Sequence, residues 1–424
     1  MLDIKFIREN LEIVKAGALK KHITVDLDGL VLLDEKRREL TQMLEAKKAE
    51  QNKISRDVGA ADEAARPALI ASVGTLKDDI QKLEEELRLV LTDWRALMVQ
   101  VPNVPDISVP DGDDDAGNVE TRVWGEKTVF DFEPKSHVEL VAMHDMADFE
   151  RGAKVAGFRG YFLKGMGVRL NYAVWNFVFD FITKRDPSFV PLLVPSLIRR
   201  EPFIGTGYLP QSEEDLYKTQ DGDYLAGTAE VGAMGFYMDE VLERGMLPVK
   251  FFGFSPCFRR EAGSHGKDTK GLMRVHEFFK FEQVILCEAS HEQSVAFHEA
   301  LTENAESIMQ ALQIPYHVVT NCGGDLGLGQ VKKYDIEAWV PSEKTYRETH
   351  SSSYFHDFQT RRLNIRYRDE DGTMRFAHSL NNTAAATPRL LIPIIENYQQ
   401  ADGTIRVPEV LVPYMGGTTV IGQA

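Results

Sequence analysis

The sequence has little of several features that define common classes of protein. Its three cysteines, Cys257, Cys287 and Cys322, are too scattered for a disulfide framework and fit no zinc-binding spacing. No apolar run approaches the roughly 20 residues that cross a bilayer. The opening residues MLDIKFIREN alternate charged and apolar side chains and lack the apolar core of a signal peptide. We therefore expect a cytoplasmic protein without structural zinc and without a membrane segment.

Positive charge and the common nucleotide-binding motifs are also in short supply. The chain has 49 Lys and Arg against 65 Asp and Glu, a formal net charge of -16. Long-range repulsion of phosphates therefore argues against unselective nucleic-acid binding, and any polyanion must meet local basic patches. Neither GxGxxG nor a GxxxxGKS/T loop occurs, so neither a Rossmann nor a P-loop nucleotide site is predicted. If ATP binds, other residues hold it.

The first hundred residues are patterned for helices. Residues 1 to about 22 predict one short amphipathic helix, and residues 27 to 98 predict two long helices separated by GAADEAARP. The second long helix places apolar residues at alternating steps of four and three, which is the seam of a coiled coil. The seam consists of Leu69, Val73, Leu76, Ile80, Leu83, Leu87, Val90, Trp94 and Leu97. The first long helix keeps this spacing, with polar residues toward its tip, so we predict an antiparallel helical hairpin.

The purpose of this hairpin, which we call the arm, is not decided by its pattern. Helices of about 30 residues would be roughly 45 Å long, so the arm must project from the rest of its domain. A dimerisation coiled coil is an equally good interpretation of the heptads. Basic and acidic side chains are interleaved along the first helix, as in Glu45, Lys47, Lys48 and Glu50, and do not separate the two uses.

A linker rich in Pro, Asp and Gly, VPNVPDISVPDGDDDAGN, follows the arm. It predicts a boundary between an N-terminal domain of residues 1–110 and a second domain of residues 111–424. In the second domain, strand-like runs such as VKFFGF and FEQVILCE lie close together and alternate with helical segments, including one over residues 288–312. This order lacks regular βαβ spacing and favours an α+β fold with a mainly antiparallel sheet.

The strongest chemical signal is the stretch SPCFRREAGSHGKDTKGLMRVHEFFKFEQ, two strand-like runs joined by a glycine-rich, cationic loop. Because side chains alternate in an extended segment, we expect Arg259 and Glu261 to share one face of the first run. Phe278, Lys280 and Glu282 share one face of the second run for the same reason. Such a face suits an anionic phosphate substrate, while an ordinary surface hairpin with solvated charges remains the alternative.

At several separate places the chain resembles the bacterial-type seryl-tRNA synthetases, a class II aminoacyl-tRNA synthetase family. The matching segments occur in the order and spacing of that family and are MLDIKFIREN, the arm, HVEL at His137, GTAE at Gly227, FRREAGS at Phe258, DFQTRR at Asp357 and ENYQQADG at Glu396. The resemblance implies an antiparallel-sheet class II catalytic domain and a homodimer whose arm reaches the tRNA bound on the partner.

The same resemblance implies an activity, its substrates and its ATP site. The enzyme would activate L-serine with ATP and Mg2+ and transfer serine to tRNA(Ser), with tRNA(Sec) as a further candidate substrate. Arg259 would grip the α-phosphate, Arg274 the outer phosphates, and Arg389 the γ-phosphate while sandwiching adenine against Phe278. Glu348 and Ser351 would hold magnesium. The full set of implied ATP-binding positions is Arg259, Arg260, Glu261, Arg274, Val275, Phe278, Glu348, Thr349, His350, Ser351 and Arg389.

The implied serine-binding positions are Thr228, Ala229, Glu230, Glu282 and Thr383. Carboxylates and hydroxyls can pair the substrate ammonium and hydroxyl, and they are left unpaired when alanine binds instead. Three alternatives stay open: a related ligase that loads a carrier protein, a catalytically silent scaffold, and a synthetase with another amino acid, which the unusual segment NNTAAATPR permits. In the same segment, a helix starting at Pro388 would contain Pro393, so we predict a kink behind Arg389.

Overall fold

The structure is a computed structural model of the chain and describes residues 1–422 except 61, 63, 65, 264–265 and 267. Its internal contacts divide the chain into two compact units, which we describe separately. Unit 1 contains Met1–Leu19 and Ile23–Pro102, and unit 2 contains Lys20–His22 and Asn103–Ala424. Among the described residues, no helix combines the length and the apolar character that a bilayer crossing requires.

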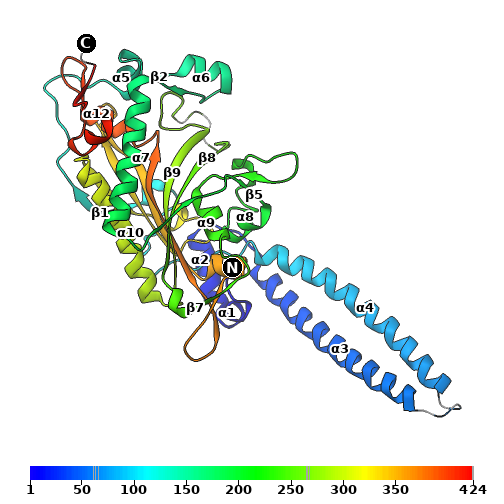
Figure 1. The fold of residues 1–424 in the computed structure, drawn as a ribbon. Coiled ribbons are helices and arrows are strands. Elements are labelled where there is room, and N and C mark those ends of the chain that lie inside the picture. Colours follow the sequence, from blue (N-terminus) through cyan, green and yellow to red (C-terminus); the bar gives the residue numbers. More distant parts are fainter. Residues whose placement is uncertain (61, 63, 65, 264–265, 267, 423–424) are drawn as a thin grey trace. The chain divides into compact units, whose positions relative to one another are not determined.

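The described residues of unit 1 form the helices α1 (Ile4–Glu9), α2 (Leu11–Lys20), α3 (Leu27–Ala60) and α4 (Arg66–Met98). The long helices α3 and α4 form the predicted arm, visible as a hairpin in Figure 1. Ion pairs Lys36–Glu86 at 2.7 Å and Lys47–Asp79 at 3.1 Å join them in antiparallel order. The turn that we predicted from GAADEAARP lies largely outside the described residues.

The expected single helix at the N-terminus is wrong, because the chain breaks at Asn10. Asn10 ends α1 with φ -132° and ψ 39°, and its side-chain amide donates to the Phe6 carbonyl at 3.1 Å. Asparagine competes with helical hydrogen bonds in this way, which makes it a common terminator. The apolar spacing alone did not reveal the break.

Unit 2 is built on an eight-stranded sheet with the order β1-β10-β11-β12-β15-β9-β8-β4. All neighbouring strands in it are antiparallel except β4 and β8, so the predicted mainly antiparallel sheet is confirmed. The strands of this sheet are β1 (Val119–Trp124), β4 (Val190–Leu193), β8 (Val249–Phe258), β9 (Glu277–Cys287), β10 (Tyr316–Thr320), β11 (Lys332–Val340), β12 (Thr345–His356) and β15 (His378–Thr387).

Helices and short strands surround this sheet. The helices of unit 2 are α5 (His137–Met143), α6 (Phe149–Ala156), α7 (Gly165–Arg185), α8 (Arg200–Thr206), α9 (Ala229–Gly235), α10 (His291–Ala311), α11 (Phe358–Leu363) and α12 (Leu391–Asn397). The short strands are β2 (Ala147–Asp148), β3 (Phe162–Leu163), β5 (Leu197–Ile198), β6 (Tyr224–Leu225), β7 (Val241–Glu243), β13 (Arg366–Arg368), β14 (Met374–Phe376), β16 (Ile405–Arg406) and β17 (Val420–Ile421).

Alternation along β9 decides which face of the sheet carries the site. Phe281 and Ile285 belong to the core that contains the apolar residues of α7 and α10. Val284 and Leu286 point the other way, into a second core with residues of α9. Because side chains alternate along a strand, Glu282 shares the face of Val284. The polar start of β9 therefore lies on the sheet face opposite α7 and α10, which Figure 1 shows side by side.

The expected kink at Pro393 is also wrong. Thr387 and Pro388 do not start a helix, because Thr387 is the last residue of β15 and α12 begins only at Leu391. Pro393 is thus the third residue of α12, where a backbone N–H would have no acceptor within the helix. The proline costs no hydrogen bond there, and α12 needs no bend.

Two buried histidines predict a loss of stability in mild acid. His298 stacks on Tyr334, with centroids 4.6 Å apart, and its Nε2 donates to the Ser352 carbonyl at 3.0 Å. Burial lowers the pKa of His298, and likewise that of His350, to about 4. Between pH 6.5 and 4 each of these histidines binds a proton in the unfolded chain but not in the folded chain. The free energy of unfolding therefore falls by about 1 kcal/mol per pH unit for each histidine.

Urea unfolding at pH 7.5, 6.0 and 5.0 measures this effect. Replacing His298 by asparagine removes one titrating group, so the variant is expected to lose less stability between pH 7.5 and 5.0 than the wild type. The prediction fails if both proteins lose the same free energy of unfolding over this range.

Candidate active site

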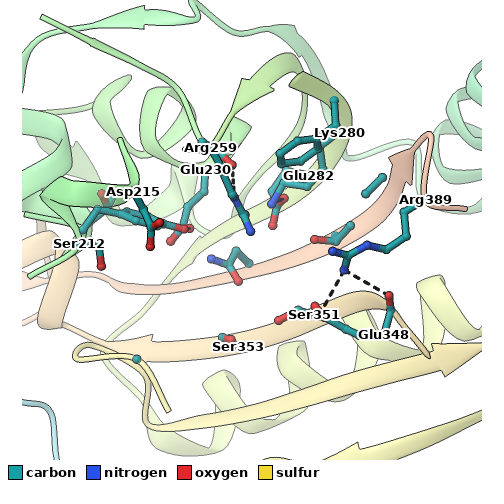
Figure 2. A pocket seen from close by; sticks show the side chains of 18 of the residues that line it. Ser212, Asp215, Glu230, Arg259, Lys280, Glu282, Glu348, Ser351, Ser353 and Arg389 are labelled. Carbon is teal, nitrogen blue, oxygen red and sulfur yellow. Dashed lines mark hydrogen bonds and ion pairs between the residues drawn. The ribbon is translucent and has the colours of Figure 1, made fainter. Parts of the chain in front are cut away.

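A cavity of about 420 Å³ opens on the α9 face of the sheet. Strands β9, β12 and β15 and the segments that follow β8 and β15 supply its walls (Figure 2). Most residues singled out from the sequence line it, although they are far apart along the chain. These are Glu230, Arg259, Glu261, Arg274, Val275, Phe278, Glu282, Glu348, Thr349, Ser351, Thr383 and Arg389.

Two arginines enter this cavity from different strands. Arg259 directly follows β8, and its Nε donates to the Gly227 carbonyl at 3.2 Å. Its guanidinium carbon lies 5.2 Å from the centroid of the Phe278 ring. Arg389 follows β15, and its Nε donates to the Met273 carbonyl at 3.1 Å. Figure 2 shows both guanidinium groups directed into the same space, an arrangement that suits a multiply charged anion.

Arg389 also contacts the acidic residue expected to hold a metal. Its Nη1 lies 3.3 Å from the Glu348 carbonyl and 3.3 Å from Glu348 Oε2. The Glu348 side chain remains 46% exposed, so its carboxylate can accept a further ligand. Ser351, three residues along β12, lines the same wall. Carboxylate and hydroxyl oxygens are ligands that Mg2+ accepts, so these residues fit the ion.

The segment after β8 differs from the sequence-based expectation. Strand β8 ends at Phe258, so Arg259 and Glu261 do not share a strand face. Glu261 has φ 56°, a left-handed conformation that turns the chain. Its carboxylate accepts a hydrogen bond from Arg274 Nη1 at 2.6 Å, and Arg274 Nε lies 3.5 Å from Asp268. Both residues still reach the cavity, but through a turn rather than through strand alternation.

Two buried carboxylates occupy the middle of the cavity. Glu282 forms an ion pair with Lys280, and Thr228 Oγ1 lies 3.4 Å from its Oε2. Glu230 accepts hydrogen bonds from Gln359 Nε2 at 2.7 Å and from the Tyr208 hydroxyl at 3.1 Å. Burial and the nearby negative charge of Glu282 raise the pKa of Glu230. The pair forms a compact, mostly buried acidic centre for a small cation.

Four of the predicted positions do not line the cavity. Thr228 caps the start of α9 and reaches the site only through its contact to Glu282. Ala229 is fully buried in the core on the α9 side. His350 is buried beside Thr349, whose hydroxyl lies 2.8 Å from its Nδ1. Arg260 lines a shallow surface pocket with Glu213 instead.

The site also involves residues that the sequence-based assignment left out, of which Gln359 does not itself line the cavity. Lys280 is the plainest, because strand alternation placed it beside Glu282 and yet no role was assigned to it. Gln359 follows Phe358 in α11, and nothing in the local sequence connects it to Glu230. The segment Gly327–Gln330 forms one end wall of the cavity. Gln359 and the segment Gly327–Gln330 arrive through tertiary packing, so no spacing in the sequence could have identified them, whereas strand alternation had already placed Lys280 on the face of Glu282.

Comparison with known proteins gives a family for this architecture. The description "Seryl-tRNA synthetase N-terminal domain" matches residues 1–105, and "tRNA synthetase class II core domain (G, H, P, S and T)" matches residues 216–398. A serine-tRNA ligase of Deinococcus radiodurans is 48% identical over 424 residues, which are 100% of this chain and 99% of the relative. The chain belongs to the seryl-tRNA synthetase family. The recognition made from its motifs is thereby confirmed.

Further relatives in the family agree with this assignment. A serine-tRNA ligase of Acidithiobacillus ferrooxidans is 42% identical, over 99% of this chain and 100% of the relative. The seryl-tRNA synthetase of Pyrococcus horikoshii, solved with ATP, superposes with a TM-score of 0.91 at 38% identity and covers 99% of each chain. The cytoplasmic serine-tRNA ligase of Naegleria fowleri, solved with AMP, has a TM-score of 0.87 at 31% identity, over 99% of this chain and 98% of its own. The class II fold with a helical arm is therefore confirmed.

Proposed function

We propose that this protein is a serine-tRNA ligase that activates L-serine with ATP, releases pyrophosphate, and transfers serine to the 3′ end of tRNA(Ser). The observation that carries this proposal is the convergence of Arg259 and Arg389 on one cavity beside the buried carboxylates Glu230 and Glu282. The full-length family relatives support the same activity, since they are serine-tRNA ligases.

The activation step needs positioning and charge stabilisation more than it needs a nucleophile from the protein. The serine carboxylate oxygen attacks the α-phosphorus, and pyrophosphate leaves with the electron pair of the broken P–O bond. Arg259 would bind α-phosphate oxygens through its planar fork and stabilise the charge that develops on them. Arg389 would bind the outer end of the triphosphate. Adenine would stack between Arg389 and Phe278, near the backbone of Val275.

Arg274 would bind the outer phosphates of ATP only after its guanidinium exchanges one of its present carboxylate partners for them. In this structure its guanidinium contacts Glu261 and Asp268. Outer phosphates could replace Asp268, whose link to Arg274 is the longer one, while Glu261 keeps the guanidinium oriented. This rearrangement would make the loop between β8 and β9 responsive to ATP.

We propose that Mg2+ binds with ATP at Glu348 and Ser351. When bound, the ion would neutralise charge on the phosphate oxygens. Glu348 would contribute its carboxylate, and Arg389, which contacts that carboxylate at 3.3 Å, would orient it. Arg389 would thus serve both the nucleotide and the metal ligand.

The substitution Glu348→Gln tests the metal assignment. The change keeps the shape of the side chain but removes its charge, so the Mg2+ concentration for half-maximal serine-dependent pyrophosphate exchange is expected to rise about tenfold. Glu337, which faces Glu348 across the β11–β12 pair and instead contacts His317, gives the matched control Glu337→Gln. Equal Mg2+ requirements in the two variants would refute the assignment.

Serine selection would rest on the acidic centre. Glu282 and Glu230 would receive the substrate ammonium and hydroxyl, with Thr383, which faces Glu282 across the β9–β15 pair, as a further hydroxyl partner. Alanine would leave these buried polar groups unpaired, which disfavours it. The ion pair between Lys280 and Glu282 keeps this acidic centre from carrying two uncompensated charges before serine binds.

The tRNA would be bound by the arm of unit 1, and a homodimer would present that arm to a tRNA on the partner. Strand β4 is an edge of the large sheet, and its side chains Val190 and Leu193 are 51% and 83% exposed. An apolar exposed edge of this kind suits a second copy of the chain. Light scattering of the purified protein checks the dimer.

We also propose a cytoplasmic location, and tRNA(Sec) as an additional substrate.

Charging of purified tRNA tests the whole reaction. Incubation with labelled serine, ATP, Mg2+ and tRNA(Ser) is expected to yield acid-precipitable label that depends on every component. A transcript of tRNA(Sec) tests the additional substrate, and a non-cognate tRNA such as tRNA(Ala) is the control. Absence of labelled tRNA(Ser) from a reaction in which pyrophosphate exchange proceeds would show that the acceptor is another molecule.

A further inference from the structure

A buried lysine outside the established site holds one wall of the cavity. Lys21 is 3% exposed, and its Nζ donates to the main-chain carbonyls of Gly327, Leu328 and Gln330 at 3.1, 3.1 and 2.5 Å. Among the described residues no carboxylate acts on it, and burial lowers its pKa well below the ordinary value of a lysine. An ammonium has three N–H donors and no acceptor, so three carbonyls satisfy it completely. Burial disfavours the charged form of this lysine, and the three carbonyl contacts counter that effect by accepting the N–H donors of the ammonium.

The carbonyls belong to Gly327–Gln330, which we call the wall loop. All four of its residues line the active-site cavity. A second residue, Asn103, binds the same loop: its Nδ2 donates to the Gly329 carbonyl at 3.0 Å, and its backbone N–H donates to the Leu328 carbonyl at 2.9 Å. The Lys21 and Asn103 donors therefore engage every main-chain carbonyl of the wall loop.

Both residues lie on the chain connections between the two units. Lys21 is in the short segment that leaves α2 for α3, and Asn103 follows α4 by five positions. Each belongs to unit 2: Asn103 directly follows Pro102 of unit 1, and Lys21 is the middle residue of Lys20–His22, which connects Leu19 and Ile23 of unit 1. Two residues at the crossings of the chain between the units thus hold the same loop of the catalytic cavity.

The wall loop is packed with little freedom. A Cβ at Gly329 would lie 2.7 Å from a ring carbon of Phe358, so the loop backbone rests directly on that ring. The next residue, Gln359, donates to Glu230 of the acidic centre. Within the loop region, Gln330 receives the Gly327 N–H at 2.6 Å and donates to Ser353 Oγ at 2.8 Å. A displaced wall loop would therefore change the cavity beside Ser353.

This end of the cavity is distinct from the phosphate-binding end. Glu348, which contacts Arg389, and Ser353, which contacts the wall loop, are five residues apart on β12. That separation corresponds to roughly 15 Å along the strand. Among the described residues, the Gly329 and Gln330 carbonyls of the wall loop each accept one hydrogen bond, so each keeps a second lone pair, and the loop carries no charged side chain. These groups suit ribose hydroxyls rather than phosphates.

We propose that Lys21 and Asn103 are positioning residues for the transfer step, because they fix the wall loop in the shape that admits the terminal ribose of the tRNA. The inference rests on the proposed function. In that step a ribose hydroxyl oxygen forms a bond to the carbonyl carbon of seryl-adenylate. The bond from that carbon to the phosphate oxygen breaks, AMP leaves with the electron pair, and the hydroxyl proton passes to solvent.

The test separates activation from transfer in two variants. Lys21→Met keeps the length of the side chain without its charge, and Asn103→Asp keeps the shape without the N–H donors. Each is expected to lower the single-turnover rate of serine transfer from preformed adenylate to tRNA about 10-fold. Serine-dependent pyrophosphate exchange should stay within about twofold of the wild type, because the phosphate end is remote from the loop. Lys5→Met, at a lysine whose side chain is 71% exposed on α1, is the matched control.

The outcomes are distinguishable from one another. Selective loss of transfer in both variants supports the proposal. Equal loss of exchange and transfer assigns these residues to general stability and overturns it, as does transfer at the wild-type rate in both variants. Should the lysine variant fail to fold, the milder asparagine variant decides alone. A wild-type protein that shows no serine-dependent exchange would instead contradict the proposed function, before either variant is considered.

Discussion

Replacing Arg259 by glutamine is expected to lower kcat/KM for serine-dependent pyrophosphate exchange by about 10³-fold, the effect of removing an arginine that stabilises charge during phosphoryl chemistry. Arg259 is anchored by its Nε to the Gly227 carbonyl, which leaves its two terminal amino groups directed at the cavity. Glutamine cannot reproduce this fork. Because the interaction strengthens as charge develops on the α-phosphate, kcat should fall more than the KM for ATP rises.

The control for this variant is another arginine that is remote from the cavity. Arg151 is 76% exposed on α6 and pairs with Asp148 at 2.6 Å, so Arg151→Gln removes the same charge from the surface. Exposed ion pairs contribute little to stability. Exchange by this control should match the wild type. A loss of less than about tenfold in the Arg259 variant would show that this guanidinium does not act on the reacting phosphate.

Shortening the arm is expected to lower kcat/KM for tRNA charging strongly while leaving serine activation intact. Removing residues 45–82 and joining the ends with a short glycine linker deletes the distal part of α3 and α4. It keeps Asp34, which is fully buried against Arg8 at 2.7 Å, and Arg37, which lies over Trp94 at 5.4 Å. Loss of about 3 kcal/mol of RNA-binding energy corresponds to about a 100-fold weaker kcat/KM for tRNA.

Two assays on the same shortened protein provide the comparison. Pyrophosphate exchange reports the catalytic unit, and charging of tRNA(Ser) reports the arm. If charging persists at the full rate, the arm has another role, and the heptad pattern would then favour the alternative of dimerisation. Light scattering on the shortened protein addresses that alternative, because a dimer that depends on the arm would dissociate.

Periodicity in the sequence predicted what depends on local chain geometry. The seam from Leu69 to Leu97 repeats at the helical period, and α4 is found where that repeat begins and ends. Alternation placed Phe278 and Glu282 on one face of β9, and both line the cavity. Helix and strand periods are properties of consecutive residues, so the prediction needed no tertiary information.

The parts that could not be predicted depend on contacts between distant residues. Asp215 accepts a hydrogen bond from the Ala262 N–H at 2.8 Å, where the chain has already left β8 and turned at Glu261. The partners of Lys21 are three carbonyls more than 300 positions away. Main-chain carbonyls look alike in every sequence, so a lysine that binds them gives no recognisable motif. A spacing rule identifies side chains that lie on the same helix or strand. Lys21 and its carbonyl partners, like Asp215 and the Ala262 N–H, lie on different parts of the fold.

Amino-acid-dependent exchange between ATP and pyrophosphate is the most direct measurement of the central claim that the two arginines and the acidic centre form one site for ATP and serine. Serine is expected to support exchange at least about 100-fold better than alanine, threonine or glycine, because only serine pairs the buried polar groups and fits the space beside them. Exchange with none of the four, or a preference for one of the other three, would contradict the account.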